Sequence, residues 1–132
     1  MDFNLSLESF EPHVAGVRAL IDLSSQSQKK APILFTSSVS TLGNWPTKHP
    51  GEKVPEKAFH DFAIPLAMGY AESKYVAELL LEDAMNESGI SAAICRVGQL
   101  AGPVSKGGMW NKQEWLPSVS SLSSHWPHPQ HS

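Results

Sequence analysis

Apolar residues near the amino terminus recur at the spacing of a helix. From residue 10 to residue 21 they lie three or four positions apart, so a helix places them on one face. These residues are Phe10, Val14, Val17, Leu20 and Ile21. Ser9 can cap the amino end, Pro12 falls in the first turn, where proline is tolerated, and Gly16 can permit close approach to a neighbour. The pattern predicts an amphipathic helix from about Ser9, packed on a sheet.

A second helical pattern begins at Tyr70 and reaches about Asn86. Its apolar residues also recur three or four positions apart and form a broad face. They are Val76, Ala77, Leu80, Leu81, Ala84 and Met85. Gly89 follows this run and favours the left-handed backbone conformation that commonly ends a helix. We therefore predict a long helix that begins near Tyr70 and ends before Gly89.

Two short apolar runs, residues 32–35 and 91–98, have the pattern of strands. Continuous apolar runs are typical of strands covered on both faces in a parallel sheet, so the pattern predicts an α/β fold. Cys95 is predicted to fill the core, because no nucleophile motif surrounds it. Arg96 must find a partner or reach the end of its strand, and structural pairing is favoured over catalysis.

The segment of residues 42–66 shows little periodicity and is rich in proline and glycine. Long irregular segments inside compact domains are usually lids or binding loops. Its aromatic residues Trp45, Phe59 and Phe62 either line a pocket or anchor the loop, and both interpretations are open. Residues 118–132 are rich in serine, histidine and proline and are predicted to form a disordered tail.

Composition narrows the class of protein. The 132 residues are enough for one domain with a hydrophobic core, and contents of 41% apolar and 17% charged residues are typical of a soluble globular protein. The net charge of -3 argues against electrostatic binding to nucleic acid or to an anionic membrane. No apolar run could cross a bilayer, and no signal peptide is visible. A single cysteine suits a reducing compartment, so we expect a cytoplasmic protein.

Tyr70 and Lys74 are the first candidates for chemistry. Four positions apart in a helix, they share one face and lie one turn from each other. A phenol titrates at about 10 when unperturbed, and an ammonium nearby stabilises the phenolate and moves the pKa toward neutral. The pair can therefore deliver or accept the proton that accompanies hydride transfer.

Hydroxyl side chains cluster where the first strand ends. Ser37, Ser38 and Ser40 follow its apolar run. Ligands in open α/β sheets bind beyond the carboxyl ends of the strands, so these hydroxyls are placed to meet a substrate. Alternatively, the serines only end the strand and cap backbone groups. The presence of Tyr70 and Lys74 favours the functional interpretation.

Taken in order, these segments resemble the second half of an extended short-chain dehydrogenase/reductase. Within that superfamily the chain most resembles the thioester reductase domains of fungal adenylate-forming reductases and nonribosomal peptide synthetases. That group includes carboxylic acid reductase-like and aminoadipate reductase-like proteins. The resemblance covers roughly residues 1–117 and rests on four segments. They are Asp2-Phe3-Asn4-Leu5-Ser6, Phe35-Thr36-Ser37-Ser38, Gly69-Tyr70-Ala71-Glu72-Ser73-Lys74 and Arg96-Val97-Gly98-Gln99-Leu100-Ala101-Gly102-Pro103.

The resemblance implies an NADPH-dependent enzyme. Its substrate would be a thioester, carried on the phosphopantetheine arm of a carrier domain, and its product an aldehyde or an alcohol. By position, Tyr70 would be the proton donor, and Lys74 would lower the pKa of Tyr70 and hold the nicotinamide ribose. Ser38 would hydrogen-bond the substrate carbonyl, and Ser37 or Ser40 would do so if the register differs.

The resemblance also implies a set of cofactor contacts and a fold. The expected cofactor-binding residues are Thr36, Ser37, Tyr70, Lys74, Val97, Gly98 and Gln99. Residues 1–117 would form part of an NAD(P)-binding thioester reductase domain. The implied fold is the carboxyl-terminal part of a Rossmann-like, doubly wound parallel sheet that lacks the first βαβ half.

Three departures from the family pattern stand out. No Gly-x-x-Gly-x-x-Gly turn follows an opening strand, and that turn is what holds the pyrophosphate in the family. His13 stands where extended members commonly have Asn. After Leu122 the sequence does not resemble the family's substrate-binding region, which suggests truncation or a shifted reading frame.

Two other functions are compatible with the sequence. The chain could be a non-catalytic remnant or interaction module, which would self-associate through its uncovered sheet or pair with a missing amino-terminal half. It could also resemble a nucleotide-sugar epimerase or dehydratase, which shares the Ser/Thr, Tyr and Lys residues. The loop from Trp110 to Pro117 resembles the thioester reductases more closely.

Overall fold

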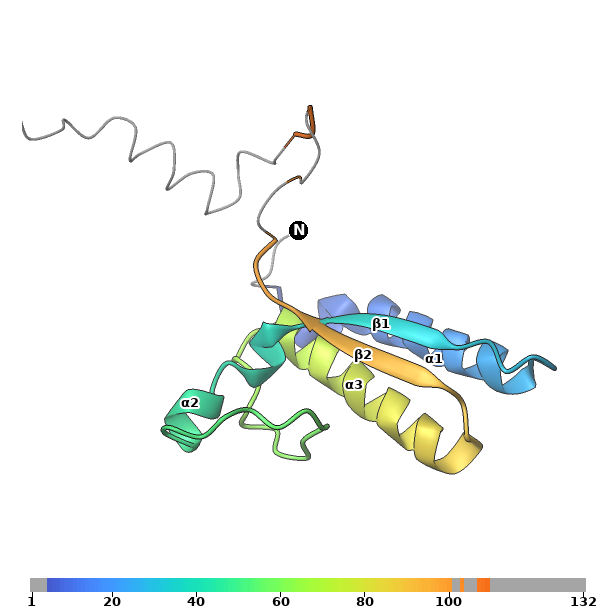
Figure 1. Cartoon of the computed structure of the whole chain (residues 1–132), viewed down its shortest axis with the longest axis horizontal. Helices are drawn as coiled ribbons and strands as arrows, with labels where there is room; N and C mark the ends of the chain where they lie inside the picture. Colours follow the sequence, from blue (N-terminus) through green and yellow to red (C-terminus); the bar gives the residue numbers. More distant parts are fainter. Residues whose placement is uncertain (1–4, 101–102, 104–106, 110–132) are drawn as a thin grey trace, which may run out of the picture. The chain divides into compact units, whose positions relative to one another are not determined.

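The computed structural model describes residues 5–100, 103 and 107–109 of the chain (Figure 1). The chain divides into two compact units, residues 1–98 and 99–132. All described helices and strands belong to the first unit. The predicted site residues from Thr36 to Gly98 belong to that unit as well, and Gln99 belongs to the second.

The first long helix, α1 (Glu11–Gln26), follows a short 3-10 helix, η1 (Leu7–Phe10). Because Ser9 lies inside η1, the residue that precedes α1 is Phe10, and the predicted cap at Ser9 is wrong. The buried face of α1 is also narrower than predicted, since Leu20 is 51% exposed.

Strand β1 (Ile33–Ser38) and strand β2 (Ala92–Val97) lie side by side and form a two-stranded parallel sheet (Figure 1). Ser38 pairs with Val97 in the register, so both strands end at the same edge of the sheet. The predicted parallel strands are confirmed. Their carboxyl ends place the Ser37–Ser38 and Val97–Gly98 segments next to each other.

The helix between the strands, α3 (Gly69–Ser88), confirms the predicted long helix. Gly89 has φ 61° and ψ 28°, the left-handed conformation expected at this end. Gly69 is required at the other end, because a Cβ there would lie 2.3 Å from the carbonyl oxygen of Leu5. The first turn of α3 is thereby packed against the backbone that leads into η1.

Both α1 and α3 pack on one face of the sheet. The buried residues of this core are Val17, Ile21, Ala77, Leu81, Ala84 and Ile90, and the half-buried ones include Ile33, Phe35, Ala92 and Ile94. Side chains alternate between the two faces of a strand, so every second residue of β1 and β2 points into this layer. The opposite set of side chains points away from the helices.

That opposite face is bare within the part of the chain that the structure describes. Leu34 is 74% exposed, and Thr36 and Cys95 are exposed as well. The prediction of strands covered on both faces is therefore wrong for these residues. The predicted core position of Cys95 is wrong for the same reason, because its side chain belongs to the face without helices.

The irregular segment contains two short helices, η2 (Val39–Leu42) and α2 (Trp45–Lys48). A second buried cluster comprises Trp45, Phe59, Ile64 and Tyr75. Trp45 and Phe59 therefore anchor the loop to α3. Phe62 is 74% exposed and meets the ring of Tyr75 edge-on, with ring centres 5.5 Å apart.

Three sequence predictions lie outside the described residues: the domain end at residue 117, the tail of residues 118–132 and the aromatic loop of residues 110–117. In the second unit, Gly107 has φ 85°, and the side-chain amide of Gln99 donates to the carbonyl of Leu100 at 3.3 Å. Within the described ranges, no helix is long and apolar enough to span a membrane.

Candidate active site

A pocket of about 180 Å³ opens between α1, β1 and α3. Its lining residues are Phe10, His13, Val14, Val17, Phe35, Tyr70, Ser73, Lys74 and Ala77. The structure therefore brings Tyr70 and Lys74 into one pocket, as their spacing in the helix predicted. Most of the other lining side chains are apolar or aromatic, so a group bound there would be partly shielded from water.

Lys74 is held by the end of β1. Its Nζ donates a hydrogen bond to the backbone carbonyl of Thr36 at 2.8 Å. The same ammonium lies 4.8 Å from the ring centre of Phe35 and 5.9 Å from that of Tyr70, where the ring quadrupoles attract a cation. Burial lowers the pKa of Lys74, because the charged form loses water. Lys74 makes no ion pair with any described residue.

Two aromatic side chains, Phe10 of η1 and His13 of α1, line the pocket next to Tyr70. The ring of Phe10 meets that of Tyr70 nearly edge-on, with centres 6.1 Å apart. The imidazole of His13 lies 5.8 Å from the ring of Phe10. His13, which departs from the family's usual Asn, is therefore part of the same pocket as Tyr70.

Ser38, the predicted contact to the substrate carbonyl, ends β1. Its Oγ accepts hydrogen bonds from the backbone N–H of Ser40 at 3.2 Å and from the hydroxyl of Ser40 at 2.9 Å. The two hydroxyls thus form a pair at the carboxyl edge of the sheet. Neither residue is among those that line the pocket of Tyr70 and Lys74. The roles assigned to Ser38 and Ser40 stay predictions.

Ser37 faces the opposite way and is buried. Its hydroxyl donates to Oε1 of Glu78 on α3. This hydroxyl is therefore already occupied, and a cofactor contact by Ser37 stays a prediction. The alternation of the strand explains the difference between neighbours, because Ser37 points toward the helices and Ser38 away from them.

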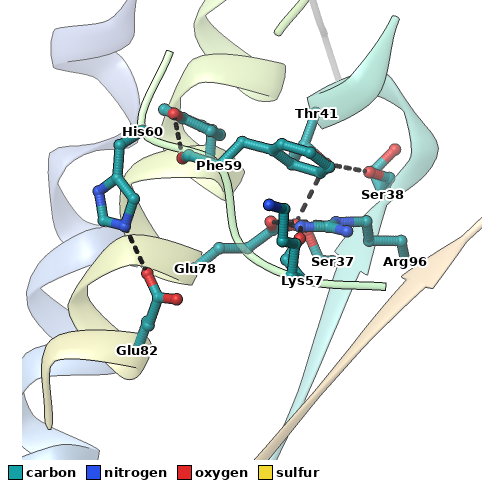
Figure 2. Close-up of polar contacts among 10 residues, drawn as sticks. Ser37, Ser38, Thr41, Lys57, Phe59, His60, Glu78, Glu82 and Arg96 are labelled. Carbon is teal, nitrogen blue, oxygen red and sulfur yellow. Dashed lines mark hydrogen bonds and ion pairs between the residues drawn. The ribbon is translucent and has the colours of Figure 1, made fainter. Parts of the chain in front are cut away.

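Glu78 is the centre of a buried polar cluster (Figure 2). Its side chain is 1% exposed. Arg96 of β2 reaches it with Nε at 3.1 and 3.0 Å from the two carboxylate oxygens and with Nη2 at 2.6 Å from Oε2. Thr41 of η2 donates to Oε1 at 3.1 Å. We call Ser37, Thr41, Glu78 and Arg96 the Glu78 cluster.

The cluster also ties down the irregular loop. Nη2 of Arg96 donates to the backbone carbonyl of Lys57 at 3.2 Å, and its guanidinium lies 5.6 Å from the ring centre of Phe59 (Figure 2). The hydroxyl of Tyr75 donates to the carbonyl of Phe59. Burial raises the pKa of Tyr75, because the phenolate would lose water. The prediction that Arg96 has a structural partner is confirmed.

Sequence reasoning did not identify Glu78 or Thr41. A signal was present, because Glu78 is a carboxylate on the apolar face of a predicted helix and Arg96 is the only charged residue in its strand. Two opposite charges in two apolar elements can be satisfied only by each other, unless water or a ligand reaches them. That rule predicts the pair, although not the hydroxyls that join it.

The remaining predicted cofactor residues lie at strand ends. Thr36 offers its carbonyl to Lys74, while its side chain is exposed on the bare face. Val97 ends β2, and a Cβ added to Gly98 would meet only the side chain of Val39, at 3.9 Å. Gln99 belongs to the second unit. The cofactor roles of these residues stay predictions.

A nicotinamide cofactor can be tested for fit against these groups. Tyr70 and Lys74 supply a hydroxyl and an ammonium beside a mostly apolar pocket, which suits a ribose and a flat ring. A volume of about 180 Å³ is below the roughly 300–1,000 Å³ typical of whole-ligand sites. The pocket therefore fits one end of a dinucleotide, and the sequence contains no glycine-rich turn for the pyrophosphate.

Comparison with known proteins supports the resemblance drawn from the four segments. The sequence model of an NAD-binding family described as male sterility protein matches residues 2–124. A carboxylic acid reductase of Neurospora crassa is 44% identical over 126 residues, which cover 95% of this chain and 12% of that protein. The adenylate-forming reductase Nps10 of Heterobasidion annosum is 39% identical over 127 residues, 95% of this chain and 11% of the relative.

A solved structure agrees with the sequence relatives. The terminal R domain from the myxalamid PKS-NRPS biosynthetic pathway is 28% identical, with a TM-score of 0.67. The match covers 86% of this chain and 28% of that one. The chain therefore spans about an eighth of the length of these curated relatives and part of a reductase domain. The predicted fold class and resemblance are confirmed.

Proposed function

The chain belongs to the NAD-binding family described as male sterility protein, and from this premise we propose that it carries the catalytic part of an NADPH-dependent thioester reductase. In this proposal a complete domain reduces a carrier-bound thioester to an aldehyde or an alcohol. The relatives support it, since they include a carboxylic acid reductase and an R domain of a PKS-NRPS pathway.

The observation that carries the proposal is the shared pocket of Tyr70 and Lys74. Lys74 is half-buried, is held by the Thr36 carbonyl and makes no ion pair among the described residues. Its positive charge can therefore act on a neighbouring phenol or a bound ligand, and not on a protein carboxylate. A surface lysine paired with a glutamate would offer no comparable charge.

The residues take the following roles in the proposed reaction. The reduced nicotinamide, when bound, supplies the hydride. Negative charge then develops on the oxygen of the thioester carbonyl, and the hydroxyls of Tyr70 and Ser38 are the donors assigned to stabilise it. Tyr70 gives its proton to that oxygen, and the ammonium of Lys74 stabilises the phenolate that remains. The C–S bond of the resulting hemithioacetal then breaks and releases the carrier thiol and the aldehyde, which a second hydride and proton would convert to the alcohol. Lys74 also has donors available for the ribose hydroxyls.

NADPH as the cofactor and a phosphopantetheine-linked acyl group as the substrate are the finer parts of the proposal. They rest on the family resemblance and on relatives that include polyketide synthases and a PKS-NRPS R domain. A carrier domain would be the partner that presents the acyl group. The proposed location is the cytoplasm.

Replacing Tyr70 with Phe in the complete domain tests the proposal. We expect Y70F to abolish thioester reduction, because the proton donor is lost, and to leave NADPH affinity nearly unchanged, because Lys74 keeps its donors for the ribose hydroxyls. The matched control is Y75F, since Tyr75 lies on the same helix with its hydroxyl bonded to the carbonyl of Phe59. Y75F should keep turnover at the temperature where it is folded. Turnover retained by Y70F would contradict the proposal.

The bare face of the sheet favours a second candidate, a non-catalytic remnant that self-associates. Leu34 and Cys95 are exposed on this face, and self-association would cover them. A thermal melt of the 132-residue chain with and without excess NADPH separates the two candidates. A ligand that binds only the folded state raises the melting midpoint. An upward shift supports a cofactor site in this chain, and an unshifted transition supports the remnant.

A third candidate, a nucleotide-sugar epimerase or dehydratase, shares the Tyr and Lys residues. The relatives named above are reductases, which favours the first candidate. Assays of the complete protein with both substrate classes would distinguish them.

A further inference from the structure

The Glu78 cluster joins every element that supplies a candidate catalytic group. Glu78 lies on α3, the helix that carries Tyr70 and Lys74. Its carboxylate accepts hydrogen bonds from Ser37 at the end of β1, from Thr41 in η2 and from Arg96 near the end of β2. Ser37 and Arg96 are directly paired in the sheet register. One carboxylate therefore connects both strand ends to the helix.

Thr41 connects the cluster to Ser38 itself. Its hydroxyl has one proton, which is shared between two acceptors, the backbone carbonyl oxygen of Ser38 at 2.8 Å and Oε1 of Glu78 at 3.1 Å. Thr41 is 0% exposed, so water does not compete for this hydroxyl. Ser38 is thus held directly by Thr41 at its carbonyl, and indirectly through its neighbour Ser37, whose hydroxyl donates to Glu78.

We infer that Thr41, Glu78 and Arg96 are positioning residues for the reduction, because they hold the Ser38 hydroxyl and the Val97–Gly98 strand end in register with Tyr70 on α3. The inference rests on the proposed function. None of the three is assigned a contact with substrate or cofactor. Their effect is on geometry: donors that must meet one oxygen come from different elements, and a displacement of about 1 Å can slow a reaction about a hundredfold.

A charged cluster is suited to this task because it has little freedom. Arg96 engages the carboxylate with both Nε and Nη2, and the planar guanidinium fixes the direction as well as the distance. An apolar contact of the same size would allow the strand ends to slide along the helix. The neighbouring ion pair of Glu82 and His60, with 2.9 Å between Oε2 and Nε2, joins α3 to the irregular loop and to neither strand.

The test compares Thr41→Val with Thr41→Ser in the complete reductase. Valine keeps the shape of threonine and removes the hydroxyl, whereas serine keeps the hydroxyl. We expect T41V to slow single-turnover hydride transfer about tenfold at saturating NADPH, with the Kd for NADPH unchanged, and T41S to restore the rate. E78Q should slow the same step about a hundredfold. E82Q, one turn further along α3, should leave it unchanged.

The outcomes separate this inference from the proposed function. A wild-type rate in T41V overturns the inference, as does a slow T41V that T41S does not restore. Loss of rate and NADPH affinity by the same factor, or an equal loss in E82Q, would indicate general destabilisation and overturn it too. If E78Q fails to fold, the T41V and T41S pair decides alone. The proposed function fails independently, through turnover in Y70F.

Discussion

Two charged side chains on α3, Lys74 and Glu78, lie one helical turn apart in opposite environments. Lys74 is half-buried, donates to one backbone carbonyl and otherwise faces the rings of Phe35 and Tyr70. Glu78 is 1% exposed and accepts hydrogen bonds from an arginine and two hydroxyls. One charge lacks a counter-charge among the described residues, and the other has a complete set of partners.

The comparison indicates that the charge of Glu78 stabilises the fold, whereas the charge of Lys74 is available to a bound ligand. Burying a carboxylate is costly unless it is paired and hydrogen-bonded, and Glu78 meets both conditions. Lys74 is partly desolvated and has no anion beside it among the described residues, which is an environment that favours binding of an anionic or electron-rich group. The same helix therefore contacts both strands through Glu78, and one turn earlier it carries Tyr70 and Lys74, the pair proposed to be catalytic.

The largest effect should come from removing the carboxylate of Glu78. E78A leaves Arg96 largely buried without its partner, and breaking a buried ion pair costs about 3–5 kcal/mol. The matched change at Lys74 is K74M, which keeps the length of the side chain and its packing on Phe35. K74M removes only one hydrogen bond, to the Thr36 carbonyl, and it also removes the cost of desolvating the ammonium. We therefore expect K74M to lower the free energy of unfolding by about 1 kcal/mol or less.

Urea unfolding of the 132-residue chain measures both changes as free energies of unfolding. An equal decrease in the free energy of unfolding in E78A and K74M would contradict the conclusion that Glu78 stabilises the fold more than Lys74 does. An E78A/R96M double variant that recovers stability would identify the unpaired guanidinium as the cause.

The next effect concerns Gly69, which sets where the turn of Tyr70 and Lys74 lies. A Cβ at this position would fall 2.3 Å from the Leu5 carbonyl oxygen and 2.5 Å from the carbonyl carbon of Ser6. G69A must move backbone, and such overpacking costs about 1–3 kcal/mol. Gly16 is the control, because an added Cβ in α1 meets nothing within 4 Å. G16A should stabilise the chain by about 1 kcal/mol through helix propensity.

Melting curves of G69A and G16A show this as shifts in opposite directions. If G69A melts at the wild-type temperature, the contact between α3 and the approach to η1 does not hold the first turn in place. G16A also tests the sequence-based prediction that Gly16 permits close approach to a neighbour, because a stabilised G16A would contradict that prediction.

Local order along the chain could be predicted well from sequence. The range of α3, its end at Gly89 and the parallel pairing of two strands all follow from spacing and from residue type. Tyr70 and Lys74 share a pocket for the same reason, because a helix fixes the relation of positions four apart. The inferences about α3 and its two residues use relations within one helix, and the parallel pairing follows from the order strand, helix, strand along the chain.

The failures concern contacts between elements. Glu78 and Arg96 are 18 residues apart, and no local pattern states that a helix and a strand bring them together. Cys95 and Leu34 were expected in a core, because an apolar strand predicts cover on both faces. Within the described residues only one face has helices, so the same apolar pattern is buried on one side and exposed on the other.

The smallest predicted effect is a pH dependence that belongs to Lys74 alone. Burial lowers its pKa in the folded chain below the ordinary value of 10.5, so between these two values the unfolded chain binds more protons. Stability of the wild type should therefore rise relative to K74M as pH increases through the folded pKa toward 10.5, and the difference should be constant below that window. Tyr75, whose pKa burial raises, is present in both chains and cancels. Melting midpoints of both proteins from neutral pH upward give the difference directly. A difference that falls with pH would mean that Lys74 has an anionic partner in the folded protein, and its turn of α3 would then resemble that of Glu78.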